Sequence, residues 1–435
     1  MNMRVRKNVI TLACIVLVKA GLFAQNEEVK LSVKEAERYA VMHNYLMKNA
    51  SLDVKKAEAT KWYAISTMLP QVSGTLDYTD YLGYEMTMRM PIPGVAPMAI
   101  PMDPTSNLTL QASIAVSGLQ IVSATLGKLA VEMAKTNHQK TEQTIKAQVR
   151  TLYFSILAME NTVELLSQSM ENMLKLEKIT QNAVSVGVSE STDADQLSVQ
   201  VSSLQNNLNS IQRSTEMLYN SMRLLLGISV NAEIVLTETI DNVLNLENAN
   251  NLLNESFLLT NNLDYQLVEK NVELTKKQVR INEWAYGPTL SAFYQYREKI
   301  KTTGFDMNPP QVVGVSLNVP IFSSGSRLAK VNEAKCTYKS ALNTMDMVTD
   351  QLKIQDRQLR YNLRSNVENY ETQRKNVEVS QRVFNNISNK YEHGYASSMD
   401  VTNSSMNLIN AQNNYIQAML NLINAQIELE TLLNK

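Results

Sequence analysis

The sequence predicts a mainly α-helical chain with a smaller membrane β part, and three observations predict it. Long stretches lack both glycine and proline, which cost a helix interior about 1 and 3 kcal/mol. The two halves of the chain repeat one order of segments. Between the helical stretches, four segments alternate apolar and polar residues in the manner of β-strands. The stretches without glycine and proline are 128–186, 188–226, 326–393 and 395–435.

These stretches are interpreted as two long helical hairpins that turn at Gly187 and Gly394. At about 1.5 Å per residue, residues 128–186 would extend roughly 90 Å, far more than an ordinary globular helix. The last stretch repeats apolar residues in heptads, which indicates coiled-coil packing; a solvated coiled-coil rod explains the heptads equally well. The heptad positions are Leu408, Tyr415, Leu422 and Leu429, with Ala411, Ala418, Ala425 and Leu432 three positions on.

The matching order of segments predicts a tandem duplication. Aligned at the two hinge glycines, Ser191 and Asp193 correspond to Ser398 and Asp400. The first repeat is expected over 25–227, with a helix, strands at about 71–86 and 106–119, and a hairpin turning at 187. The second is expected over 228–435, with an equatorial segment at about 228–260, strands at about 289–303 and 311–323, and a hairpin turning at 394.

The four alternating segments have the length of membrane-spanning strands. They start near Val72, Leu108, Leu290 and Val313 and each runs for about ten residues, the length of strand that crosses a bilayer. Only closed barrels satisfy all backbone hydrogen bonds in lipid, and the smallest have about eight strands. Four strands per chain therefore require several subunits, and this argument alone does not choose between a dimer and a trimer.

The beginning of the chain is typical of a secretory signal peptide. Basic residues at 4, 6 and 7 precede an apolar run, and Leu22-Phe23-Ala24 is a plausible cleavage site, so residues 1–24 are expected to be removed. Only Cys336 would then remain, which leaves no internal disulfide.

Composition and motifs argue against catalysis and against nucleic acid. The formal net charge is −1, which favours no nucleic-acid partner. No phosphate-binding glycine loop, nucleophile elbow or spaced set of metal ligands is present, so the chain is not expected to be an enzyme or to need a cofactor or metal. A loop at 85–104 holds five methionines, whose thioethers suit Cu(I), but proline-rich loops are ordinary between membrane strands.

Several motifs, in their order and duplication, resemble one family: the TolC-type outer-membrane efflux channels. The likeness covers nearly all of the chain after residue 24. It rests on the segments Leu31-Ser32-Val33-Lys34-Glu35-Ala36, Leu69-Pro70-Gln71-Val72-Ser73, Val319-Pro320-Ile321-Phe322-Ser323-Ser324-Gly325, and the hinges Val186-Gly187-Val188 and His393-Gly394-Tyr395.

The resemblance implies a homotrimer whose twelve-stranded β-barrel, with four strands per chain, is joined to a long α-helical coiled-coil barrel. It further implies a location in the outer membrane with an extension into the periplasm. The function expected is passive export through an exit duct of a tripartite efflux or secretion system, gated at the periplasmic tip. The partners expected are a periplasmic adaptor (membrane fusion) protein, an inner-membrane pump and outer-membrane lipid.

The resemblance also implies roles for residues at the hinges. Val186, Gly187, Val188, His393, Gly394 and Tyr395 correspond to adaptor-docking tips. Asp400 and Asn403 correspond to two acidic positions that line the constriction, and the asparagine leaves only one carboxylate per chain. Tyr391 and Asp193 correspond to positions that hold the closed tip together. Independently of the family, Ser397-x-x-Asp400 fits a helix capping box, and Asp193 fits the acidic first turn of a helix.

The sequence is compatible with two alternatives. A periplasmic coiled-coil adaptor also carries long helices, but four alternating strands and two hairpins per chain do not suit it. A structural coiled-coil surface protein is the other.

Overall fold

The computed structural model describes residues 28–88, 94, 97–239, 246–301 and 308–435. The expected signal peptide, 1–24, lies outside these residues. The described chain forms two compact units: 28–50, 138–263 and 350–435 make the first, and 51–137 with 264–349 make the second. Each unit draws on both halves of the sequence, so neither unit coincides with one expected repeat.

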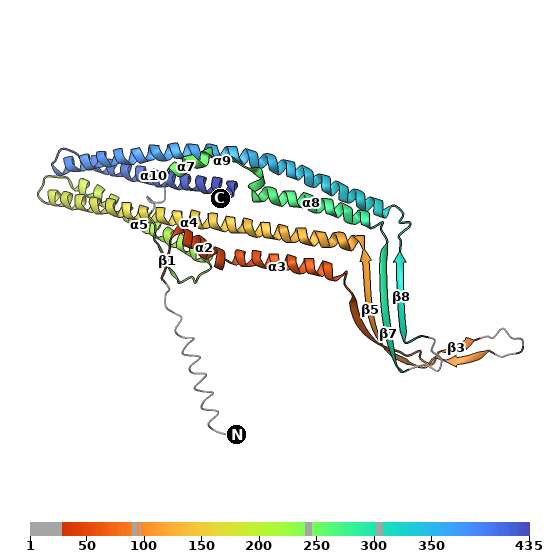
Figure 1. Cartoon of the computed structure of the whole chain (residues 1–435). Helices are drawn as coiled ribbons and strands as arrows, with labels where there is room; N and C mark the ends of the chain where they lie inside the picture. Colours follow the sequence, from red (N-terminus) through yellow and green to blue (C-terminus); the bar gives the residue numbers. More distant parts are fainter. Residues whose placement is uncertain (1–27, 89–93, 95–96, 240–245, 302–307) are drawn as a thin grey trace, which may run out of the picture. The chain divides into compact units, whose positions relative to one another are not determined.

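The first unit is helical (Figure 1). It contains α2 (Val33–His43), α5 (Ser191–Leu226), α7 (Leu246–Asn254), the short η1 (Leu259–Asn261) and α10 (Ser398–Leu433). It also holds the later parts of α4 (Gly118–Ser185) and α9 (Ser326–Glu392), which are 68 and 67 residues long. The hairpins α4–α5 and α9–α10 share one apolar core. Its buried residues are Leu166, Met173, Leu176, Leu197, Leu204, Leu208, Phe384, Val401, Leu408 and Ile409. Leu408, one of the heptad positions, therefore lies in a core that both hairpins share.

The two hairpins end in the same way. The side-chain amide of Asn44 donates to the carbonyl of Leu225 (2.7 Å), and that of Asn262 donates to the carbonyl of Leu432 (3.1 Å). Each asparagine is buried, and each satisfies a carbonyl that the end of a helix leaves without a partner. Leu225 and Leu432 occupy matching places in α5 and α10, so this recurrence supports the duplication.

A small parallel sheet, which the sequence analysis did not anticipate, lies in the first unit. Strand β1 (Glu28–Leu31) pairs with β6 (Glu233–Leu236). Ser32 and Glu35 form a capping box that begins α2 directly after β1. The buried Tyr153 of α4 donates its hydroxyl proton to the carbonyl of Leu31 (3.0 Å), which fastens the strand to the helix.

The second unit contains a four-stranded antiparallel sheet and the helices that continue its strands. The strands are β2 (Gln71–Thr79), β5 (Thr105–Ser117), β7 (Thr289–Lys301) and β8 (Gln311–Asn318), in the order β2-β5-β7-β8. Helices α3 (Tyr45–Ser66) and α8 (Leu263–Trp284) precede β2 and β7, while α4 and α9 follow β5 and β8. The four strands expected from the sequence are present, and one chain supplies no closed barrel within the described residues.

The register of this sheet separates an apolar face from a polar one. Apolar side chains stand directly opposite one another across all three strand pairs; examples are Leu76–Leu108, Leu110–Tyr296, Ala112–Tyr294, Val116–Leu290, Leu290–Leu317 and Tyr294–Val313. The other face pairs Thr75 with Thr109 and Ser291 with Ser316, whose hydroxyls lie 2.7 Å apart. On the apolar face Val72 and Val313 are 75% and 78% exposed. So large an apolar surface marks a site of interaction with lipid or protein.

The methionine-rich loop forms a hairpin of β3 (Glu85–Met88) and β4 (Met98–Pro101). Part of this loop, 89–93 with 95–96, lies outside the described residues. Within the described ranges, no group of His, Cys, Asp or Glu side chains is placed to hold a metal ion. The same ranges contain no helix with the length and apolar character needed to cross a membrane.

Candidate functional site

The residues expected at the tips lie at the two helical turns of the first unit. Gly187 and Gly394 have φ angles of 80° and 77°, in the left-handed region that glycine adopts without strain. After each glycine the chain donates back across five residues: Val188 N to Ala183 O (2.9 Å), and Tyr395 N to Lys390 O (2.8 Å). These are the hydrogen bonds of a Schellman motif, so both hinges are helix C-caps of the same type.

Large apolar side chains project from both turns. Val186 and Val188 are 73% and 79% exposed, and Tyr395 is 83% exposed. His393 is also exposed, and its Nδ1 lies 2.7 Å from the carbonyl of Asn389 in the preceding turn. Exposed apolar groups at a turn are costly in water, which makes the two tips candidate contact surfaces for another protein.

The helices that follow the two turns begin differently. Ser397 caps α10: its hydroxyl accepts from the backbone N–H of Asp400 (3.1 Å), and the Asp400 carboxylate accepts from the Ser397 N–H (3.0 Å) and hydroxyl (2.7 Å). This capping box is the one that the sequence indicated. At the matching place before α5, Glu190 makes no side-chain cap. Asp193, the counterpart of Asp400, therefore has its carboxylate available for another partner.

That partner belongs to the other hairpin. The buried hydroxyl of Ser398 donates to Oδ1 of Asp193 (2.5 Å), which joins the start of α10 to the start of α5. A second hydrogen bond joins the hydroxyls of Thr180 on α4 and Tyr391 on α9. The sequence predicts roles for Asp193 and Tyr391 but for neither of their partners. Ser398 was visible as the residue aligned with Ser191, whereas no signal in the sequence singled out Thr180.

Asp400 and Asn403 are exposed and lie on the first turns of α10, and neither forms a hydrogen bond or ion pair with the opposite hairpin among the described residues. The backbone and side-chain hydrogen bonds from Ser397 lower the pKa of Asp400 below its ordinary value of 3.8. The carboxylate is therefore ionised at neutral pH and is directed toward its own helix cap.

An ion cluster fixes the other end of the helical unit. The Arg150 guanidinium of α4 donates to Glu37 of α2 and to Glu430 of α10, the latter at 2.5 Å. Burial lowers the pKa of Arg150, but the hydrogen bonds and charges of the two glutamates outweigh burial and raise it. Glu37 is itself buried, so this cluster ties three helices together through a desolvated pair.

The model of the family described as outer membrane efflux protein matches residues 256–435, which include β7, β8 and the second hairpin with its tip. Residues 256–435 are therefore similar to the outer membrane efflux protein family. No match is found among curated protein sequences.

Solved structures of outer-membrane proteins share the fold of almost the whole chain. The outer membrane protein VceC of Vibrio cholerae is 16% identical, with a TM-score of 0.74 over 92% of this chain and 95% of that one. The CmeC channel of Campylobacter jejuni is 14% identical, with a TM-score of 0.75 over 92% and 85%. The open state of the MtrE channel of Neisseria gonorrhoeae is 14% identical, with a TM-score of 0.73 over 92% and 88%. The shared fold covers the first half of the chain as well as the residues that the family model matches.

Proposed function

We propose that this chain is one subunit of an outer-membrane exit duct, through which a tripartite efflux or secretion system exports small molecules or proteins. The observation that carries the proposal is the four-stranded sheet whose register gathers apolar side chains on one exposed face and polar ones on the other. Such a sheet suits a wall between lipid and an aqueous lumen. The family match and the shared channel fold support it.

The edges of the sheet indicate how the wall would close. Strands β2 and β8 each have one partner among the described residues, so one edge of each remains unpaired. In lipid an unpaired edge is very unfavourable, because its N–H and C=O groups find no water. Pairing β8 of one copy with β2 of the next closes the sheet, and three copies give the twelve strands of a homotrimer.

The partners and the gate belong to the same proposal. The exposed tips at residues 186–188 and 393–395 would dock a periplasmic adaptor, through which an inner-membrane pump supplies the energy. Asp193 and Tyr391 would hold the closed mouth by their hydrogen bonds across the hairpins. Asp400 would place one carboxylate per subunit at the constriction beside Asn403. No residue of the duct is assigned a catalytic role.

Extraction from membranes tests the duct. The protein is expected in the outer-membrane fraction, where detergent releases a species that migrates as a trimer on unheated gels and as a monomer after heating. The purified trimer is expected to conduct ions in a planar bilayer. A water-soluble monomer without detergent would refute the proposal and favour the adaptor instead.

Ion selectivity tests the role of Asp400. Asp400→Asn is expected to reduce the preference for cations in the planar bilayer, whereas Asp195→Asn, an exposed change on α5 near the other tip, should leave it unchanged. Because hydrogen bonds from Ser397 lower the pKa of Asp400, the carboxylate stays charged as pH falls through 3.8. The cation preference should therefore persist at that pH and disappear only below it. Equal selectivity in Asp400→Asn and the unmodified channel would remove the role.

A further inference from the structure

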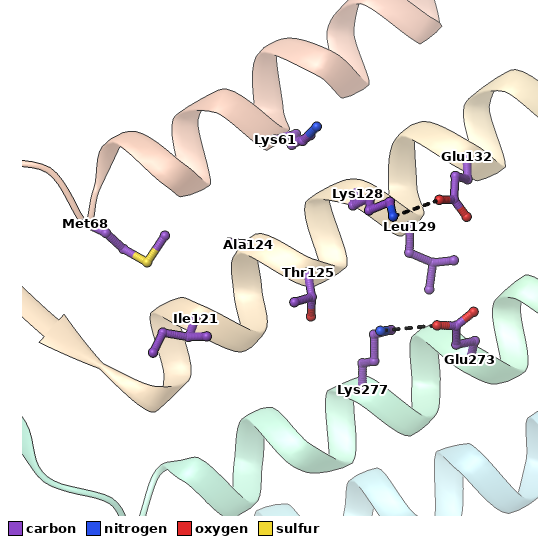
Figure 2. A pocket seen from close by; sticks show the side chains of 10 residues that line it. All are labelled: Lys61, Met68, Ile121, Ala124, Thr125, Lys128, Leu129, Glu132, Glu273 and Lys277. Atoms are coloured by element: carbon purple, nitrogen blue, oxygen red, sulfur yellow. Dashed lines mark ion pairs between the residues drawn. The ribbon is translucent and has the colours of Figure 1, made fainter.

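A groove on the second unit has no part in the duct as proposed above. It has a volume of about 550 Å³ and lies along α4, with α3 on one side and α8 on the other (Figure 2). Apolar groups of Met68, Ile121, Ala124 and Leu129 contribute to its lining. The rest of the lining is Lys61 of α3, Thr125, Lys128 and Glu132 of α4, and Glu273 and Lys277 of α8. Its chemistry is therefore that of an apolar channel with a cationic rim.

The groove is complete within one chain. A Cβ on Gly127 would lie 3.0 Å from Cα of Lys61, so α3 lies close against α4. On the other side the indole of Trp284 covers Gly118, which brings the end of α8 against the start of α4. The central helix α4 is thus flanked by both neighbours, in the order of the strands that these helices continue. Copies added at the edges β2 and β8 would leave the groove open.

The lysines of the groove have charge to offer a ligand. Lys128 and Lys277 pair with Glu132 and Glu273 of their own helices at 4.0 and 3.2 Å (Figure 2). Both glutamates are about half exposed, and exposed pairs of this kind contribute little stability, so a ligand can compete for the lysines. Lys61 has no hydrogen bond or ion pair with any other described residue. Three ammonium groups against two carboxylates leave the rim positive, which suits an anion.

Along each of the three helices, the lysine has the same position relative to the sheet. In sequence, each lysine is seven residues farther from the sheet than an apolar or aromatic residue. Lys61 precedes Met68, which lies two residues past the end of α3; Lys128 follows Ile121; and Lys277 precedes Trp284, which lies outside the lining. Seven residues are nearly two helical turns and span about 10 Å. In α4 and α8 this spacing also keeps both residues on one helix face. The three lysines consequently form a cationic level, and the apolar residues lie between that level and the sheet.

Trp284 indicates what kind of anion fits. Trp284 is 49% exposed and does not itself line the groove; its indole lies over Gly118 at the beginning of α4, three residues before the lining residue Ile121. Tryptophan and lysine in this order, toward and away from the apolar region, are typical of a protein surface that meets lipid headgroups. A free inorganic anion would use the lysines alone and would leave the apolar lining without a function.

We propose that the groove binds an anionic glycerophospholipid of the leaflet that meets the helical end of the sheet. The phosphate lies at the level of Lys61, Lys128 and Lys277, and an acyl chain follows Ile121 and Met68 toward the apolar face of the strands. This inference rests on the proposed function, because it requires that apolar face to lie in a membrane. It adds a specific lipid site to a contact that would otherwise be nonspecific.

The two tryptophans of the chain make the site measurable. In Trp62→Phe, Trp284 is the only indole, and brominated lipids that lie against it quench its fluorescence. Trimers of this variant are reconstituted with brominated phosphatidylglycerol or brominated phosphatidylcholine at equal mole fractions. Further variants are Lys61→Gln with Lys277→Gln, and as a control Lys56→Gln, which removes an exposed lysine of α3 outside the groove. Trimer migration and conductance are recorded for every sample.

Brominated phosphatidylglycerol is expected to quench the fluorescence of Trp284 at lower mole fractions than brominated phosphatidylcholine. Each lysine lost should weaken that preference roughly fivefold. The double lysine variant should therefore respond nearly equally to the two lipids, and Lys56→Gln should behave as the parent. Equal quenching by both lipids in the parent, or an undiminished preference in the double variant, overturns the site. Quenching of Trp284 by a water-soluble quencher alone, with conductance intact, also overturns the site and leaves the duct standing; absence of conductance and of trimers refutes the duct itself.

Discussion

Loss of the two hydrogen bonds between the hairpins is expected to open the periplasmic mouth. The Ser398 hydroxyl is 4% exposed and donates to a carboxylate, and a hydrogen bond to a charged group contributes about 1.5–3 kcal/mol. The neutral bond between Thr180 and Tyr391 contributes about 0.5–1.5 kcal/mol. If the open state lacks both, their removal shifts the ratio of closed to open subunits by about 2–4.5 kcal/mol, or roughly 30- to 2,000-fold.

The perturbation is the double variant Asp193→Ala with Tyr391→Phe, measured as single-channel conductance in planar bilayers. Conductance is expected to rise in the double variant and to rise less in each single variant. Asp195→Ala serves as the matched control, because it removes an exposed carboxylate from the same turn region of α5 that has no hydrogen bond or ion pair to the other hairpin among the described residues. Wild-type conductance in the double variant, with an unchanged unfolding temperature, would refute the proposal that these two hydrogen bonds hold the mouth closed.

Three further changes probe the supports of the site. Arg150→Met leaves Glu37 buried without its partner and should lower the free energy of unfolding by about 3–5 kcal/mol in chemical denaturation. Ser397→Ala removes the cap of α10 and should cost about 1 kcal/mol; it should also bring the pKa of Asp400 back toward 3.8, as NMR titration of the carboxyl would show. Gly394→Ala forces a Cβ into a left-handed turn with φ 77° and should cost about 1–2 kcal/mol, seen as a lower unfolding temperature. An unchanged value in any of these measurements would contradict the corresponding contact.

The long helices and the four long strands of the fold could be predicted from the sequence. The absence of glycine and proline predicts α4, α5, α9 and α10, because each such residue is costly within a helix. Alternation predicts the four long strands, since a period of two is specific when one face is apolar. The capping box that Ser397 and Asp400 form at the start of α10 could also be predicted, because its two residues are only three positions apart.

Contacts between distant segments could not be predicted in the same way. Strands β1 and β6 have four residues each and are separated by most of the first half of the chain, so neither length nor pattern identifies them. The partners of Asp193 and Tyr391 lie on the opposite hairpin, and only the packing of the two hairpins brings them together. The lysine level of the groove depends on three helices whose neighbour relations are set by the order of the strands.

The order β2-β5-β7-β8 has a consequence for biogenesis. The central pairing joins Ser117 to Thr289, so the residues from 118 to 288, with the whole first hairpin, must be made and exported before the sheet can form. Pairing across so long a loop is slow, and meanwhile the finished pair β2–β5 presents an apolar ribbon to the aqueous compartment. Such a ribbon invites mispairing with other chains. Strand order alone therefore sets an interval during synthesis in which the apolar side chains of β2 and β5 remain uncovered until β7 arrives.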